Sequence, residues 1–226
     1  EYLKKCNIKS DIQPYPSIAL GAVEISLFEM VQAYTMFPGA GYNAQPFFIN
    51  RIEDKNGLVL EQFMPNSREA LSEESAFVIT NLLEGVTESG SGIRLRTKGA
   101  SYVDNIVTGY PYGFTNPIAG KTGTTQNQSD GWFMGVTQKI VAGVWVGGDD
   151  RSIHFRSLAL GQGAKMAMPA FAKFMEKVYA DQSLAIEGYR KMPFIKPENI
   201  AFDFSCVGGI GGDSTLTSST ATALPE

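Results

Sequence analysis

Three short apolar segments separated by polar turns occupy residues 117–148 and constrain the fold more than any other feature. They read "PIAGKTGTT", "DGWFMGVTQ" and "IVAGVWVGG". The last is almost wholly β-branched or small and apolar, which is typical of a buried strand. Because the link "TQK" between the last two is short, we expect them to pair as an antiparallel meander. The Lys-Thr-Gly-Thr run at residues 121–124 is thereby predicted to lie on a strand of a sheet.

Helices are predicted around these strands. Ser26 with Glu29 three positions later has the spacing of a capping box, and apolar residues follow at helical spacing as far as Phe37. Ser72 and Ser75 can each cap a second helix that stops at Gly90. A third is predicted over "GAKMAMPAFAKFMEKVYAD", despite Pro169 near its start. Together with the antiparallel meander, these helices predict an α+β fold in which helices flank an antiparallel sheet.

A hairpin and two irregular regions complete the chain. The stretch "PFFINRIEDKNGLVLEQF" alternates apolar and polar residues around Asn56-Gly57, a strong signal for a two-stranded ribbon. Residues 90–116 show no clean period and are expected to form a long loop. Residues 196–226 are rich in Gly, Ser and Thr, so we expect a disordered tail. One domain over residues 1–195 is therefore predicted.

Composition excludes several classes of function. The 226 residues carry a formal net charge of -4, whereas nucleic-acid-binding domains usually present a basic stripe. With two cysteines and one histidine, the chain cannot supply the usual ligand set of a zinc site. No run of about 18 apolar residues is present, so no membrane-spanning segment is expected in this chain. Neither a cofactor nor a nucleic-acid partner is predicted.

The run "AGKT" also ends the phosphate-binding loop of nucleotide-binding proteins, and that alternative is weak here. The loop needs a glycine five residues before Gly120, where this chain has Thr115. In a phosphate-binding loop, a helix begins after the lysine and its N-terminus binds the phosphate. The polar and Gly-rich residues after Lys121 do not favour a helix there.

An ordinary edge strand is the other simple interpretation, because lysine discourages strand-to-strand aggregation and threonine favours strands. The same residues also suit one wall of an acyl-transfer site. Lys121 would place a positive charge beside a catalytic serine, and threonine hydroxyls would hold a substrate carboxylate. Gly123 would let a substrate lie close to the backbone, and an unpaired strand N–H would donate to an oxyanion.

Beyond the triplet, the chain resembles the transpeptidase domain of class A penicillin-binding proteins. The Lys-Thr-Gly triplet belongs to the signature of penicillin-binding proteins and serine β-lactamases. The segments "YPSIALGAVEISLFEMVQAYTMF", "ESGSGIRLR", "IAGKTGTTQNQSDGWFMGVTQKIVAGVWVGGDDR" and "LGQGAKMAMPAFAKFM" follow the family's order over roughly residues 1–180. The resemblance implies the penicillin-binding protein/serine β-lactamase-like fold.

The resemblance also implies roles for the four residues of the run. Lys121 would face the nucleophilic serine and organise proton transfer, and the hydroxyls of Thr122 and Thr124 would bind the terminal carboxylate of a D-Ala-D-Ala stem peptide. The Thr124 backbone N–H would be one oxyanion donor. Gly123 would leave room for the acyl group, and β-lactams would acylate the same serine.

The chain departs from the family in one respect. No serine is followed three positions later by lysine, and no Ser-x-Asn triplet occurs. The start "EYLKKCNI" reads as the tail of a helix, so we expect a piece that begins inside a longer protein and lacks the N-terminal side of the fold. Its partner would then be the upstream half of the same domain, at the periplasmic face of a membrane. A non-catalytic β-lactam-sensing or wall-binding module and a serine β-lactamase stay as alternatives.

Other eye-catching residues have simpler explanations. A lone histidine in a loop, His154, is more often structural than catalytic. Glu84 and Glu88 are spaced like the paired carboxylates of a glycosidase. Such a pair more often belongs to an acidic, solvent-facing side of a helix. Trp132 and Trp145 are expected in the core, with Trp132 able to back the site.

Overall fold

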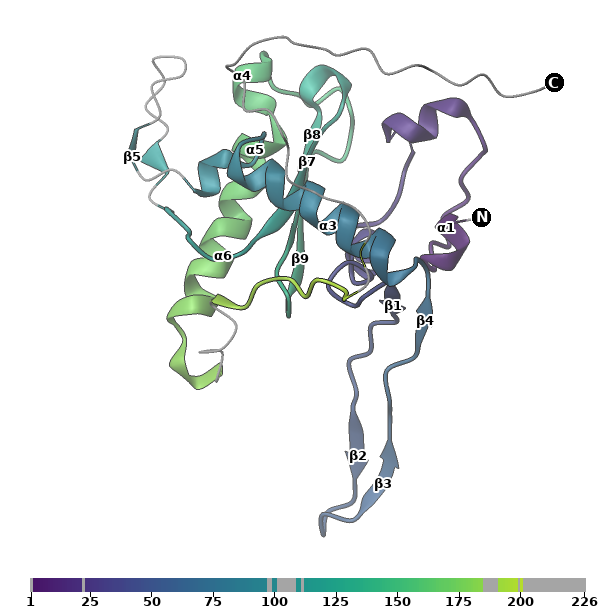
Figure 1. Cartoon of the computed structure of the whole chain (residues 1–226). Helices are drawn as coiled ribbons and strands as arrows, with labels where there is room; N and C mark the ends of the chain where they lie inside the picture. Colours follow the sequence, from purple (N-terminus) through teal and green to yellow (C-terminus); the bar gives the residue numbers. More distant parts are fainter. Residues whose placement is uncertain are drawn as a thin grey trace, which may run out of the picture.

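A three-stranded antiparallel sheet lies at the centre of the computed structural model, which describes residues 2–21, 23–96, 99–100, 109–110, 112–184, 191–198 and 200. Its strands are β7 (Ala119–Thr124), β8 (Asp130–Val136) and β9 (Val141–Gly147), in the order β7-β8-β9. Lys121 pairs with Met134, and Trp132 pairs with Trp145. The predicted meander is therefore confirmed, with β7 at one edge of the sheet (Figure 1).

Helices and small strands surround this sheet. The helices are α1 (Tyr2–Lys5), α2 (Leu27–Tyr34), α3 (Glu73–Glu88), α4 (Leu158–Gly161), α5 (Gly163–Met166) and α6 (Met168–Ala180). The short 3-10 turns are η1 (Pro16–Leu20), η2 (Ile93–Leu95), η3 (Gln126–Gln128) and η4 (Gln182–Leu184). The remaining strands form three antiparallel pairs: β1 (Tyr42–Ala44) with β4 (Ser67–Glu69), β2 (Arg51–Glu53) with β3 (Val59–Gln62), and β5 (Gly99–Ala100) with β6 (Gly109–Tyr110).

Helices α5 and α6 cover one face of the sheet, and glycines make their close approach possible. A Cβ on Gly135 would lie 2.2 Å from the ring of Phe171 on α6. The main hydrophobic core sits in this layer, where Phe133 of β8 and Phe171 are fully or almost fully buried with ring centroids 4.9 Å apart. This packing fixes the sheet against the C-terminal helices.

The opposite face is covered only in part. A Cβ on Gly143 would meet Val31 and Leu27 of α2, so α2 packs over β9. Helix α3 contacts β7, and a second cluster forms where Leu83 of α3 meets Ala119 and other apolar side chains. Toward the other end of the strands this face is open, and Trp145 is 41% exposed. The expectation that both tryptophans are core residues is wrong, since Trp132 is only half-buried as well.

The sequence also predicts the helix starts correctly and misplaces one break. Ser26 caps α2 and forms the full capping box with Glu29, and Ser72 caps α3. The third predicted helix is in fact two, α5 and α6, which meet at Ala167 two residues before Pro169. Proline lacks the N–H of a continuing helix and clashes with the preceding turn.

Most of the predicted tail, residues 199 and 201–226, lies outside the described residues, as do residues 97–98, 101–108 and 111 of the predicted loop. In the described part of the chain, each helix is too short or too polar to cross a bilayer.

Glu29 ties the start of α2 to the segment before it. Its carboxylate accepts hydrogen bonds from the Ser10 hydroxyl at 2.7 Å, the Ser26 hydroxyl at 2.8 Å and the Lys9 backbone N–H at 2.7 Å. These bonds favour the charged form, chiefly those from the Ser10 and Ser26 hydroxyls, and they lower the pKa of Glu29 to about 2. The folded state therefore binds a proton on Glu29 less readily than the unfolded chain does.

We expect this depressed pKa to appear in acid unfolding. Because the folded pKa lies below the unfolded value of 4.5, the stabilisation is complete above pH 4.5 and is lost as the pH falls toward 2. The variant Glu29→Gln should be less stable than wild type at neutral pH by about 1 kcal/mol, the usual contribution of a helix cap, with the gap closing in acid. Urea unfolding at a series of pH values measures this gap. The double variant Ser10→Ala/Ser26→Ala should lose less stability between pH 4.5 and pH 2 than wild type does. If the free energy of unfolding of Glu29→Gln changed with pH in parallel with that of wild type, the assignment would be contradicted.

Candidate active site

Strand β7 has a free edge at the Lys-Thr-Gly-Thr run. In the sheet, β7 pairs with β8 on one side, and on its other side no strand pairs with it among the described residues. The Thr125 N–H donates to the Asp130 carbonyl at 3.2 Å, so odd-numbered residues of β7 direct their backbone groups to β8. The backbone N–H and C=O groups of Thr122 and Thr124 therefore point to the free edge.

The strand register separates the four side-chain positions into two sets. Residues directly opposite each other share a face, so Thr122 lies with Phe133 and Thr124 with Gly131, on the face that α5 and α6 cover. Lys121 and Gly123 lie on the other face with Trp132, where the sheet is open. A ligand along the free edge would meet the threonine hydroxyls from one side and the lysine from the other.

Lys121 is exposed, and its ammonium group stays at this edge. The Lys121 Nζ donates to the Thr122 carbonyl oxygen at 2.7 Å. Within the described residues, no carboxylate lies at ion-pair distance from Lys121. The structure thus brings a cation beside the outward-pointing backbone groups of β7.

Both threonine hydroxyls already have a hydrogen-bond partner within the chain. The Thr122 Oγ1 lies 2.7 Å from the Ser91 Oγ, which comes from the loop after α3. The Thr124 Oγ1 accepts a hydrogen bond of 3.0 Å from the backbone N–H of Gly163, the first residue of α5. Because Thr124 acts here as acceptor, its hydroxyl hydrogen is left to donate to a ligand.

The backbone of α5 approaches β7 and β8 so closely that only glycine fits. A Cβ on Gly163 would lie 2.2 Å from the Gly123 carbonyl oxygen and 2.5 Å from that of Trp132. Both neighbours are backbone atoms, which cannot rotate out of the way. Gly163 therefore sets the distance between α5 and the strand that carries the motif.

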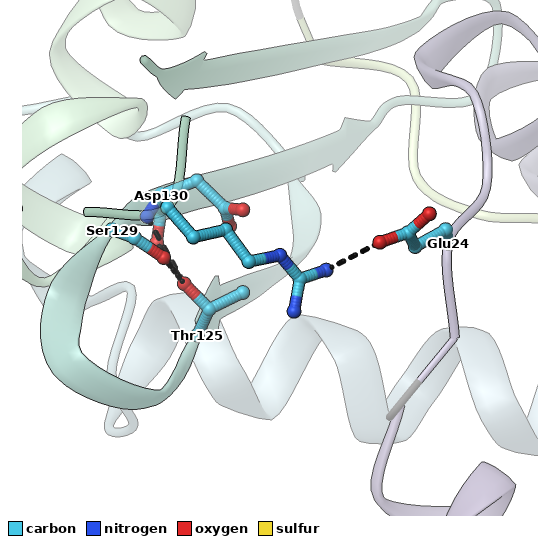
Figure 2. A network of polar contacts seen from close by, with 5 residues as sticks. Glu24, Thr125, Ser129 and Asp130 are labelled. Carbon is cyan, nitrogen blue, oxygen red and sulfur yellow. Dashed lines mark hydrogen bonds and ion pairs between the residues drawn. The ribbon is translucent and has the colours of Figure 1, made fainter. Parts of the chain in front are cut away.

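A tight turn follows β7 and returns the chain into β8. Figure 2 shows Thr125 facing Ser129 and Asp130, with hydroxyl oxygens of Thr125 and Ser129 3.1 Å apart and the Asp130 N–H donating to Thr125 Oγ1 at 3.0 Å. Asn127 has φ +60° inside this turn, a left-handed conformation that asparagine tolerates well. Glu24, also labelled in Figure 2, pairs with Arg151 at 2.9 Å, an exposed contact that contributes little energy.

Arg96 anchors the segment that leads into β7. Its Nη1 donates to the carbonyl oxygens of Phe114 at 3.2 Å and of Asn116, and its Nη2 donates to the Ile118 carbonyl at 3.3 Å. The same Nη2 donates to the Thr87 hydroxyl of α3 at 3.0 Å, and that hydroxyl also binds the Ile118 carbonyl. The guanidinium thus links α3 to three carbonyls of the approach to the strand.

Burial and neighbouring charges shift the pKa values of Arg96 and of Glu84 on α3. Burial lowers the pKa of Arg96, while the nearby Glu88 and Glu84 oppose that shift. The pKa of Glu84 is raised, first by burial and then by repulsion from Glu88. Both carboxylates thus interact with the charge of Arg96, which anchors the approach to β7, and the glycosidase interpretation gains no support.

Sequence reasoning missed Ser91 and Arg96. Both lie in or beside the segment "ESGSGIRLR", which the sequence pattern marks only as a Gly-rich loop. Thr122 is 31 residues from Ser91, and the three carbonyls that Arg96 binds are 18–22 residues from it along the chain, so no local pattern could pair them. His154, by contrast, is exposed, and its Nδ1 lies 3.0 Å from the Phe155 carbonyl oxygen.

Two partly open pockets of the described structure are lined by residues outside β7. One, of about 100 Å³, is lined mainly by apolar side chains including Phe37, Phe77 and Phe194. The other, of about 70 Å³, is lined by amides and Arg68. The described residues also include no group of three or more His, Cys, Asp or Glu side chains placed to ligate a metal. In the described structure, the motif lies on an exposed edge of the sheet.

Comparison with known proteins gives one consistent result. The family model described as "Penicillin binding protein transpeptidase domain" matches residues 9–181. Penicillin-binding protein 1A of Aquifex aeolicus is 32% identical over 202 residues, which cover 88% of this chain and 25% of that protein. Penicillin-binding protein 2D of Bacillus subtilis is 29% identical over 197 residues and covers 87% of this chain. The chain spans about a quarter of the length of these relatives.

Solved structures agree on the fold. The crystal structure of penicillin-binding protein 1A from Haemophilus influenzae matches 80% of this chain and 30% of its own, with a TM-score of 0.65 and 24% identity. The PonA1 protein from Mycobacterium tuberculosis in complex with penicillin V matches 88% of this chain and 52% of its own, with a TM-score of 0.63 and 20% identity. The mixed α+β fold predicted from the sequence is therefore confirmed, and the chain belongs to the transpeptidase domain family of class A penicillin-binding proteins.

Proposed function

We propose that this chain is the C-terminal part of a peptidoglycan D,D-transpeptidase that works by serine acyl transfer. The observation that carries the proposal is the free edge of β7, where the exposed Lys121 donates to the Thr122 carbonyl and the backbone N–H of Thr124, two residues farther on, points outward. A cation and a fixed N–H donor at one edge are what a developing oxyanion and a substrate carboxylate require. The family match over residues 9–181 supports the same conclusion.

The proposed reaction assigns a role to each residue of the run. A serine hydroxyl adds to the carbonyl of the penultimate D-Ala, its proton passes to the departing amine, and the terminal D-Ala leaves. The Thr124 N–H stabilises the oxyanion, and Lys121 holds a positive charge beside the serine. The Thr122 and Thr124 hydroxyls bind the terminal carboxylate, and Gly123 leaves space for the acyl group. An acceptor amine of a second stem peptide then displaces the serine and completes the cross-link.

The nucleophile in this proposal comes from outside these 226 residues. No serine of the chain has a lysine three positions later, and no Ser-x-Asn triplet is present. We assign the serine and its base to an upstream half of the same domain, which would face the open side of the sheet around Lys121 and Trp145. Residues 1–195 would then be the C-terminal part of the transpeptidase domain and residues 196–226 a tail. The complete protein would act at the periplasmic face of a membrane.

Labelling with a fluorescent penicillin tests the missing nucleophile. We expect the 226-residue chain to show no covalently labelled band on a denaturing gel, because no serine-lysine pair is available to attack the β-lactam ring. The full-length protein, treated in parallel, should be labelled. A labelled band from the chain alone would mean that it holds a reactive serine of its own.

A further inference from the structure

The β2–β3 ribbon leaves the body of the molecule and exposes a row of unpaired backbone groups. Figure 1 shows it projecting away from the central sheet and its helices. Its apolar side chains are uncovered, with Leu58 64% exposed and Leu60 61% exposed. A two-stranded ribbon is marginally stable in water, and its edges invite pairing with another strand.

The two edges of the ribbon are not equivalent. In the register, Ile52 pairs with Glu61 and Glu53 with Val59, so Leu60 of β3 has no opposite residue. A bulge of this kind bends its strand and disfavours further pairing at that edge. Strand β2 carries no extra residue, so its edge is the regular one.

The hydrogen-bond pattern shows which groups of β2 are free. The Asn50 carbonyl accepts from the Phe63 N–H at 2.9 Å, and the Asp54 N–H donates to the Leu58 carbonyl at 2.9 Å. Since neighbouring residues of a strand point in opposite directions, Asn50, Ile52 and Asp54 direct their backbone toward β3. Arg51 and Glu53 therefore present their N–H and C=O groups at the outer edge.

The charges at this edge complement a second copy of themselves. If two β2 strands pair antiparallel about a two-fold axis at Ile52, Arg51 of each copy faces Glu53 of the other. These are the residues whose backbone groups are free, so the same register satisfies both hydrogen bonding and charge. Within one chain, Arg51 and Glu53 already form an exposed ion pair, and such pairs are weak enough to exchange for a cross-strand one.

We propose that the chain forms a symmetric homodimer by pairing β2 with β2 of a second copy, giving a four-stranded sheet in the order β3-β2-β2-β3. The two Ile52 side chains, each 39% exposed in the single chain, meet at the two-fold axis. An isologous contact of this type closes on itself and does not propagate into a fibre. The inference does not rest on the proposed catalytic role, because it involves no residue of β7.

Charge exchange provides the sharpest test. The variants Arg51→Glu and Glu53→Arg each place like charges opposite one another at both ends of the contact. We expect each to weaken dimerisation of the 226-residue chain by about tenfold, as two unfavourable cross-strand pairs would. An equimolar mixture of the two variants restores opposite charges at both positions, so it should dimerise as wild type does in analytical ultracentrifugation.

A cysteine trap reports the register independently. Residues paired across the axis without backbone hydrogen bonds have Cα atoms about 4.5 Å apart, which a disulfide can span. With the native Cys6 and Cys206 replaced by alanine, Ile52→Cys should form a disulfide-linked dimer under mild oxidation. The control Leu58→Cys should not, because the two copies of residue 58 lie three strand spacings apart across the sheet, at least about 14 Å.

Two results would overturn the proposal. One is a wild-type chain that stays monomeric at every concentration tested, which would assign the exposed edge to a different protein or domain. The other is a mixture of Arg51→Glu and Glu53→Arg that dimerises no better than either variant alone. Because these residues are exposed, loss of dimer without loss of folding is readily checked by circular dichroism.

Discussion

Replacing Lys121 by alanine in the complete penicillin-binding protein should slow acylation by penicillin by a factor on the order of 10² to 10³. That is the usual effect of removing one group that stabilises charge in an acyl-transfer transition state. The fold should survive, because Lys121 is exposed and its one described hydrogen bond runs to the neighbouring Thr122 carbonyl. Surface substitutions of this kind usually change the free energy of unfolding by less than about 0.5 kcal/mol.

The measurement is the second-order rate constant for acylation, followed by stopped-flow fluorescence with a labelled penicillin. Lys139→Ala serves as a matched control, since Lys139 is also exposed but lies in the turn between β8 and β9. Lys121→Arg keeps the charge in a different shape and should recover part of the rate. An acylation rate within about threefold of wild type for Lys121→Ala would remove Lys121 from the mechanism, since a catalytic charge is worth far more.

The sequence predicts well those features whose cause is local. The capping box at Ser26 and Glu29 requires residues three positions apart, and Asn56-Gly57 defines a turn by its own backbone preferences. The β-branched run of β9 and its short link to β8 set the antiparallel meander, which in turn puts Lys121 on a strand. Each of these inferences needed only a short window of sequence.

Features that depend on distant contacts were missed. The Ser91–Thr122 contact and the Arg96 link to Ile118 join segments that meet only in the folded chain. The expected burial of Trp145 is wrong for the same reason. An apolar strand pattern predicts burial, but it does not show whether another element of the chain covers that part of the sheet. The division between α5 and α6 has a local cause instead. Pro169 in the sequence favours a break, whereas the apolar pattern predicts one continuous helix.

We expect Gly163→Ala to lower stability more than an ordinary surface substitution. The new methyl group would lie 2.2 Å from the Gly123 carbonyl oxygen and 2.5 Å from the Trp132 carbonyl oxygen, so α5 or the two strands must move. Overpacking of this kind typically costs about 1–3 kcal/mol. In a chain of this size, about 3 kcal/mol corresponds to a fall in melting temperature of about 6–12 °C. Differential scanning calorimetry of the 226-residue chain measures it.

Gly85→Ala is the matched control, because Gly85 lies inside α3 and a Cβ there would meet no atom within 4 Å. An alanine at that site should raise stability by about 0.5–1 kcal/mol, since glycine is unfavourable within a helix. Displacing Gly163 also moves the N–H that donates to Thr124 Oγ1, so Gly163→Ala should slow acylation in the complete protein while Gly85→Ala should not. If Gly163→Ala melted at or above the wild-type temperature, the close contact between α5 and the motif strand would not exist in solution.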